Sequence, residues 1–293
     1  MEHPNIDAPG GMPHARIIEG IALADEIRHE VQEQIQKLKI APGLAVLLVG
    51  HNPASELYVR LKQRAAHEAG IIFSLYRFDE KVKEAELFET IDWLNRDNDI
   101  HAILIQLPLP PRFDTDTVIR AIDPKKDADG FHPDNVTAYL SDTGVCAPGL
   151  AMGIMQLIQS TGQNIAQKSA LIIARDSVFT KTLSHTLKAF GVTASVAGPD
   201  DEKMPAAARA ADILITAIGK PGAITAAQVK SNSIIIDVGI TRQGNKTVGD
   251  VDFESCGKKA GWITPVPGGV GPMTVAALLK SVLALAREQT RQA

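Results

Sequence analysis

The feature of this sequence that most constrains its fold is the alternation of short apolar runs with longer amphipathic stretches. Runs rich in β-branched residues are typical of strands, and alternating strands and helices indicate a parallel α/β architecture. Two runs, at residues 46–49 and 234–236, are apolar without a break, as expected for strands buried on both faces. The expected strands lie at residues 45–49, 101–106, 170–173, 192–196, 213–218 and 234–238.

Composition indicates a compact globular protein that acts on small molecules. The 293 residues suffice for one large or two ordinary domains, and a hydrophobic content of 45% is enough to bury a core. The net charge of −4 leaves no basic stripe, so neither nucleic acid nor a membrane is expected as a partner. Because the sequence has no long apolar run, no signal peptide and only Cys146 and Cys256, a reducing cytoplasm is expected.

A second constraining feature is the segment from Thr264 to Thr274, whose eleven residues include three prolines and three glycines. Proline fixes φ, while glycine permits backbone shapes and close approaches that other residues do not. The segment predicts a fixed loop whose main chain can lie against a flat ligand; a simple turn before the last helix is the alternative. After Met273, apolar residues recur at a helical period, at Val275, Leu278, Leu279, Val282, Leu283 and Ala286.

The chain is expected to divide near residues 144–153, where Gly and Pro cluster after a polar stretch. Residues 1–14 show no apolar period and are expected to be a disordered leader. We predict a first domain over residues 15–150 and a second over residues 151–267.

One predicted helix carries two side chains suited to chemistry. Residues 54–69 are expected to be helical and to end at Gly70, a residue suited to the C-terminal cap. Tyr58 and Lys62 are four residues apart, so they share one face of this helix. Burial there would lower the pKa of the lysine ammonium toward the operating pH, as acid–base catalysis requires. Taken alone, such a pair is more often a solvated helix face.

Two further polar residues follow in the same half of the chain. Gln106 ends a predicted strand, where its amide would point into the crevice at the carboxyl end of a sheet; a loop-capping amide is the alternative. Asp129 lies in the turn-like segment 127–130, where an aspartate bonded to its own backbone is the alternative. A metal site built from Asp127 and Asp129 is not expected, because no His or Cys cluster accompanies them.

Five ordered motifs lie at residues 43–71, 103–110, 126–133, 211–251 and 264–274. Through them the chain resembles the bifunctional methylenetetrahydrofolate dehydrogenase/methenyltetrahydrofolate cyclohydrolase family, the bacterial FolD proteins. The resemblance implies an N-terminal α/β catalytic domain, a Rossmann-like parallel-sheet domain that binds NAD or NADP, and a C-terminal helix, within 268–293, that returns to the first domain. It also implies a folate substrate, a homodimer, and a Pro/Gly loop placed in the cleft between the domains.

The resemblance also assigns roles to residues. It makes Lys62 the central acid/base group of the cyclohydrolase step, Tyr58 a group that positions the folate, and Gln106 the partner of the lysine. Asp129 is implied to bind the pterin ring, whose N–H groups suit a carboxylate acceptor. Substrate contacts are implied at Ser55, Val59, Leu107, Pro267, Gly268 and Gly269, and cofactor contacts at Ala174, Arg175, Asp176, Ser177, Asp200, Gly219 and Ile240.

The chain departs from the family in its nucleotide-binding loop. Residues 174–182 contain no glycine, whereas a glycine-rich turn lets the backbone approach pyrophosphate, and Asp176 adds like charge. Asp200 stands where the family has a basic residue that favours NADP. An acid there repels a 2′-phosphate and can accept a hydrogen bond from a ribose 2′-OH, which favours NAD; a solvated loop acid is the alternative. The family's threonine before the second domain is also absent from residues 145–148.

Three functional hypotheses follow. The leading one is oxidation of 5,10-methylenetetrahydrofolate with NAD or NADP, followed by hydrolysis of the methenyl product to 10-formyltetrahydrofolate. The altered loop and Asp200 motivate the second, a paralogue that prefers NAD or retains only the cyclohydrolase. The third is a non-catalytic folate-binding homologue.

Overall fold

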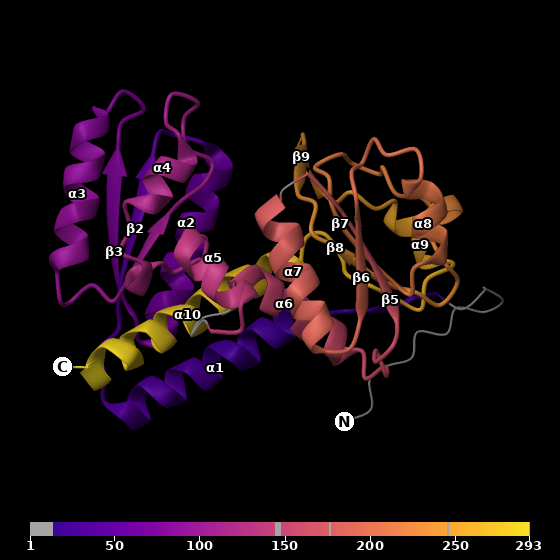
Figure 1. Cartoon of the computed structure of the whole chain (residues 1–293), viewed down its shortest axis with the longest axis horizontal. Helices are drawn as coiled ribbons and strands as arrows, with labels where there is room; N and C mark the ends of the chain where they lie inside the picture. The colour runs from indigo at the N-terminus through magenta and orange to yellow at the C-terminus, as the bar shows by residue number, and fades with distance from the viewer. Residues whose placement is uncertain (1–13, 144–147, 176, 245, 293) are drawn as a thin grey trace. The chain divides into compact units, whose positions relative to one another are not determined.

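The computed structural model describes residues 14–143, 148–175, 177–244 and 246–292 (Figure 1). Contacts within the chain divide it into two compact units. The first, which we call the three-stranded unit, holds the described residues of 20–156, 181–186 and 271–293. The second, the six-stranded unit, holds those of 1–19, 157–180 and 187–270. The predicted domain ranges stay a prediction, and part of their expected boundary, residues 144–147, lies outside the described residues.

A parallel sheet with the strand order β3-β2-β4 forms the centre of the three-stranded unit (Figure 1). Every side chain of β2 is buried, which explains its unbroken apolar sequence. The edge strand β3 was not expected, because its half-exposed side chains include polar residues. The elements of this sheet and its helices are β2 (Gly43–Val49), β3 (Ile72–Phe78), β4 (Ala102–Ile105), α1 (Gly20–Leu38), α2 (Pro53–Ala69), α3 (Glu84–Arg96), α4 (Thr115–Arg120) and α5 (Pro133–Leu140).

Helix α2 begins and ends as the sequence predicts. The Asn52 side chain accepts hydrogen bonds from the backbone N–H groups of Ala54 and Ser55, and Pro53 occupies the first turn, where its missing N–H costs nothing. Gly70 ends the helix at a φ of 82°, in the left-handed region that glycine adopts without strain. These caps fix the register of the helix face that carries Tyr58 and Lys62.

The last helix, α10 (Val270–Gln292), joins the three-stranded unit from residue 271 onward. It lies along α1, where Lys280 pairs with Glu30 at 3.0 Å, and the Gln289 amide donates to the His101 carbonyl at 2.8 Å. The predicted return of this helix to the first domain is therefore confirmed. Within the described residues α10 is long and apolar enough to cross a membrane, but 56% of the apolar window is buried inside the protein, as in a core helix.

The six-stranded unit is built on a parallel sheet with the order β1-β11-β8-β7-β5-β6. Strands β5 to β8 are labelled in Figure 1. The chain places β6 on one side of β5 and then crosses to β7 on the other, so the strand order reverses at β5. Such a reversal opens a ligand crevice at the carboxyl ends of the strands. The strands are β1 (Arg16–Ile17), β5 (Ser169–Ala174), β6 (Thr193–Ala197), β7 (Ile213–Ala217), β8 (Ile234–Asp237) and β11 (Trp262–Ile263).

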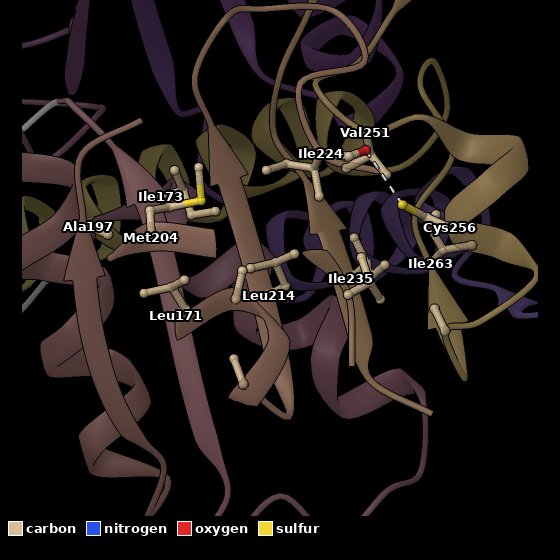
Figure 2. Packing of buried hydrophobic residues seen from close by; sticks show 14 of the residues in the cluster. Leu171, Ile173, Ala197, Met204, Leu214, Ile224, Ile235, Val251, Cys256 and Ile263 are labelled. Carbon is tan, nitrogen blue, oxygen red and sulfur yellow. Dashed lines mark hydrogen bonds between the residues drawn. The ribbon is translucent and has the colours of Figure 1, made fainter. Parts of the chain in front are cut away.

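Apolar side chains from the strands and the segments that cover them form the core of this unit (Figure 2). Leu171, Leu214 and Ile235 come from three adjacent strands and are each no more than 1% exposed. Cys256 belongs to the same cluster, with its thiol donating to the Ile224 carbonyl at 3.5 Å, and burial raises its pKa to about 11. This thiol is therefore a core group.

The remaining elements connect these sheets or cover the six-stranded unit. Helix α6 (Gly149–Ser160) links the units, and β9 (Thr241–Gln243) with β10 (Lys246–Val248) forms an antiparallel pair. Each of the six predicted strands is present within two residues of its expected bounds. The last helix begins earlier than expected, at Val270, because Pro272 fits the first turn, where no backbone N–H is needed. The other helices are α7 (Ser177–Ala189), α8 (Met204–Ala210) and α9 (Phe253–Gly257).

Candidate active site

Lys62 and Gln106 meet in the three-stranded unit although 44 residues separate them. Lys62 lies on α2, and its ammonium donates to Oε1 of Gln106 at 2.9 Å. Gln106 follows β4, with its backbone N–H donating to the Leu47 carbonyl on β2 at 2.9 Å. Its own amide donates to the Leu107 carbonyl at 2.8 Å, which fixes the orientation of the side chain. The amide thus presents an oxygen to the lysine.

The electrostatics of this site suit proton transfer. Burial lowers the pKa of the Lys62 ammonium, and the nearby Asp129 carboxylate partly opposes that change. Burial raises the pKa of Asp129, with the charge of Lys62 acting in the opposite direction. The pKa values of Lys62 and Asp129 are therefore shifted toward each other, as is common for pairs of groups in acid–base sites.

Asp127, the neighbour of Asp129, performs the structural role that the sequence left open for Asp129. The carboxylate of Asp127 accepts hydrogen bonds from the backbone N–H groups of Gly130 at 3.1 Å and His132 at 2.7 Å, and from the Asn135 amide at 3.0 Å. It is 4% exposed and closes the turn. Asp129 is the carboxylate that acts on Lys62.

The other predicted substrate contacts on α2 differ in their surroundings. Tyr58 is half-buried, and burial raises the pKa of its hydroxyl. Ser55 donates to the Leu107 carbonyl at 3.3 Å and so ties α2 to the segment after Gln106. Val59 is fully buried and packs into the interior. Substrate contacts by Ser55, Val59 and Leu107 stay predictions.

The Pro/Gly segment belongs to the six-stranded unit up to Val270, and its conformation is fixed as predicted. The Gly269 N–H donates to the Pro265 carbonyl at 2.9 Å, and a Cβ on Gly269 would meet that oxygen at 2.7 Å. Gly268 adopts a φ of 109°, which side-chain-bearing residues rarely reach. The Thr264 hydroxyl accepts from the Asp237 N–H at 2.8 Å. Folate contacts by Pro267, Gly268 and Gly269 stay predictions.

A pocket of about 430 Å³ lies in the six-stranded unit, after the carboxyl ends of β6 and β7. The guanidinium of Arg175 forms an ion pair with Asp200 at 2.6 Å on one side of it. Lys220 and Gln228 were not among the predicted cofactor contacts and add polar groups to the lining; the position of Lys220 directly after Gly219 was the signal that pointed to it. The lining residues are Arg175, Pro199, Asp200, Met204, Ile218, Gly219, Lys220, Ala223 and Gln228.

The pocket unites three of the seven predicted cofactor contacts, namely Arg175, Asp200 and Gly219. Ala174 is the buried last residue of β5, and Ser177 begins α7. Ile240 is 46% exposed and lies outside the lining of this pocket. Asp176 lies outside the described residues. In the part of the chain that the structure describes, no three His, Cys, Asp or Glu side chains gather as metal ligands.

A reversed parallel sheet with a polar pocket and a lysine–amide–carboxylate set are together typical of a two-domain enzyme that binds a nucleotide and performs acid–base chemistry. The chain belongs to the tetrahydrofolate dehydrogenase/cyclohydrolase family: residues 18–129 match the model of its catalytic domain, and residues 148–290 match that of its NAD(P)-binding domain. It is accordingly a methylenetetrahydrofolate dehydrogenase and methenyltetrahydrofolate cyclohydrolase of one-carbon metabolism, and the predicted family, fold class and activity are confirmed.

Similar proteins support this assignment over nearly the whole chain. The bifunctional protein FolD of Moorella thermoacetica is 46% identical over 277 residues, which cover 93% of this chain and 99% of that protein. The solved structure of the bifunctional FolD enzyme from Campylobacter jejuni has a TM-score of 0.89 at 38% identity, covering 94% of this chain and 99% of that one. The Trypanosoma brucei enzyme, solved with NADP and an inhibitor, has a TM-score of 0.91 at 32% identity, covering 96% and 100%.

Proposed function

We propose that Lys62 is the acid/base group of the cyclohydrolase step, with Gln106, Asp129 and Tyr58 arranging the reactants. The observation that carries this proposal is the 2.9 Å hydrogen bond between Lys62 and Gln106, at a lysine whose pKa is lowered by burial. The methenyl substrate is a cation, so a neutral amine is a better neighbour for it than an ammonium.

Hydrolysis then proceeds in two steps. Water adds to the methenyl carbon while the neutral Lys62 amine takes one of its protons. The resulting ammonium returns that proton to N5 as the carbon–N5 bond breaks, and the carbinol O–H proton leaves to solvent, so that 10-formyltetrahydrofolate and one proton are the net products. Gln106 accepts a hydrogen bond from the ammonium, and the Asp129 carboxylate stabilises its charge.

For the dehydrogenase step, the six-stranded unit is proposed to bind the nicotinamide nucleotide in the pocket beside Arg175. The fit rests on the donor set of that pocket, since Arg175, Lys220 and the Gln228 amide suit the phosphates and hydroxyls of a nucleotide. When bound, the nicotinamide accepts the hydride that leaves the methylene bridge of the folate. The protein supplies binding and orientation.

A preference for NAD over NADP is the second candidate, and one observation favours it. Asp200 engages Arg175 at 2.6 Å at the edge of the pocket. A free arginine at this position of the fold accommodates a 2′-phosphate, whereas an acid after the second strand accepts from a ribose 2′-OH. Arg175 is 61% exposed, so the pair itself adds little stability, and its effect lies in the charge it presents to a ligand.

Initial rates with methylenetetrahydrofolate, offering NAD and NADP in parallel, test both candidates. Reduction of either nucleotide together with hydrolysis of methenyltetrahydrofolate is the expected result. Faster reduction of NAD supports the role of Asp200. Hydrolysis with reduction of neither nucleotide would leave a cyclohydrolase alone, and absence of both activities would leave only folate binding.

Replacing Gln106 with glutamate is expected to raise the pKa of Lys62, because an opposite charge close to an ammonium favours its protonated form. The limb of the cyclohydrolase pH–rate profile that reports the titration of Lys62 should therefore move to higher pH. Gln63→Glu, on the exposed side of the same helix, adds the same charge to solvent and should leave the profile in place. An unchanged profile in Gln106→Glu would contradict the role of Lys62.

We further propose that the enzyme works as a homodimer in the reducing cytoplasm. Support for the dimer comes from β6, an edge strand of its sheet on which Val196 is 50% exposed. Support for the reducing compartment comes from Cys256, which is a buried free thiol. Sedimentation of the full chain should give twice its mass. Val196→Lys should shift it to the monomer mass, and a wild-type chain that sediments as a monomer would refute the dimer.

A further inference from the structure

Asp250 follows β10 in the chain, and its fully buried carboxylate lies beside the carboxyl end of β7, next to the proposed nucleotide pocket. One of its oxygens accepts from the Thr216 hydroxyl at 3.2 Å and from the Ile218 N–H at 2.5 Å. The other accepts from the Lys220 N–H at 2.8 Å. Asp250 therefore binds the backbone on both sides of Gly219, and Ile218, Gly219 and Lys220 all line the pocket.

The surrounding backbone leaves this carboxylate little room to move. A Cβ on Gly239 would lie 2.2 Å from the carboxyl carbon of Asp250. On the adjacent strand, the Asp237 carboxylate accepts from the N–H groups of Gly239 at 2.9 Å and of Asp250 itself at 3.1 Å. A Cβ on Gly249 would in turn lie 2.0 Å from an oxygen of Asp237. Asp250 thus holds the loop after β7, and Asp237, at the end of β8, holds the backbone of Asp250 and of Gly239. Hydrogen bonds through Asp250 therefore join the ends of the two strands.

The bound loop has the form of an anion-binding nest. Gly219 has a φ of 73°, and the N–H groups on either side of it converge on one carboxylate. Convergent backbone N–H groups of this kind commonly bind phosphate or other anions. Here a side chain of the protein supplies the anion.

We infer that Asp250 is the positioning residue of the nucleotide pocket. It draws the amides of residues 218 and 220 toward the protein interior and so sets the conformation in which Gly219 and Lys220 face the ligand. The nucleotide phosphates cannot use these amides, and Lys220 meets them through its side chain. This inference rests on the proposed binding of the nucleotide in that pocket.

The test is calorimetric titration of the full-length Asp250→Asn variant with NAD and with NADP. An asparagine keeps one oxygen acceptor and places an NH2 group against the other donor, so the backbone N–H of either Ile218 or Lys220 loses its acceptor. The loop is then no longer held in its binding conformation, and the Kd of the preferred nucleotide should rise about tenfold or more. In the dehydrogenase assay the KM for the nucleotide should rise more than kcat falls. The thermal unfolding transition of the variant, measured in parallel, reports whether the six-stranded unit is folded.

Asp212 provides a matched control, because it lies immediately before β7, at the opposite end of the same strand. Its carboxylate likewise accepts three hydrogen bonds, from the backbone N–H and the hydroxyl of Ser169 at 2.9 and 3.0 Å and from the Lys230 ammonium at 2.7 Å. Asp212→Asn should lower the melting temperature without changing the Kd for the nucleotide. A purely structural role for Asp250 predicts the same behaviour for both variants.

Each outcome decides the inference. If Asp250→Asn binds the nucleotide as tightly as the wild type, or if Asp212→Asn weakens binding equally, Asp250 is not a positioning residue. If the wild type binds neither nucleotide, the proposed nucleotide site fails, and the inference fails with it. Should Asp250→Asn not fold, Thr216→Val removes a single donor to the same carboxylate. A roughly threefold rise in Kd then supports the inference, and wild-type affinity refutes it.

Discussion

Cyclohydrolase turnover should fall by about 10²- to 10⁴-fold when Lys62 is replaced with methionine, because that is the usual contribution of a positioned acid/base group. Methionine preserves much of the buried stem and removes the group that donates to Gln106. Binding of the folate should persist, since the rest of the site remains. The measurement is hydrolysis of methenyltetrahydrofolate under saturating conditions, together with the Kd of the folate by calorimetry.

Arg64→Met is a suitable control for this change. Arg64 lies two residues further along α2 with its side chain 81% exposed, and it pairs with Glu68 on the surface. The substitution removes a cation from the same helix and should leave both turnover and the folate Kd unchanged. Undiminished hydrolysis in Lys62→Met, with folate still bound, would refute the assigned role. Loss of folate binding would show that the lysine acts mainly in binding.

Replacing Asp200 with serine should improve kcat/KM for NADP relative to NAD by about 5- to 10-fold. The substitution removes a negative charge from the edge of the pocket and frees Arg175 for a 2′-phosphate. Asp200 is 85% exposed, so water screens its charge, and one charge–charge interaction at such a site is worth about 1 kcal/mol, where 1.4 kcal/mol is tenfold. Initial rates with both nucleotides across a range of concentrations give the ratio.

The adjacent Asp201 supplies the control for this prediction. It is exposed, and its carboxylate accepts from the Lys203 N–H at 2.8 Å, away from Arg175. Asp201→Ser changes the net charge equally and should leave the NADP-to-NAD ratio as it is. Equal ratios in Asp200→Ser and the wild type would mean that the Arg175–Asp200 pair does not set the cofactor preference.

Much of the fold could be predicted because its signals are local. The unbroken apolar sequence of β2 and the caps of α2 at Asn52 and Gly70 each lie within a few residues of the structure they specify. Strand β3 could not be found in this way, because an edge strand with half-exposed side chains lacks that pattern. The two-residue strands β1 and β11 are too short to carry a period at all, and they form only by pairing with each other and with β8.

Only part of the candidate site was named from the sequence: Lys62, Gln106 and Asp129 were, whereas Lys220 and Gln228 of the pocket were not. Asp127 and Asp129 are equivalent as sequence neighbours, and the structure separates them: Asp127 is held by three donors, and Asp129 acts on Lys62. Asp200 was singled out as an acid at a position where the family has a basic residue. Its 2.6 Å pair with Arg175 joins residues 25 positions apart and required the fold.

The sequence by itself determined where six of the strands and the helices α2 and α10 lie, which family the chain resembles, and which residue types are available for acid–base chemistry. These properties depend on periodicity, caps and short motifs, all of which are local. Only the tertiary structure decided that Lys62 meets Gln106 across 44 residues, and that the carboxylates of Asp212 and Asp250 lie at opposite ends of β7. The physical reason is that hydrogen bonds and pKa values depend on distances and burial, and residues far apart in the chain acquire these only when the sheets assemble.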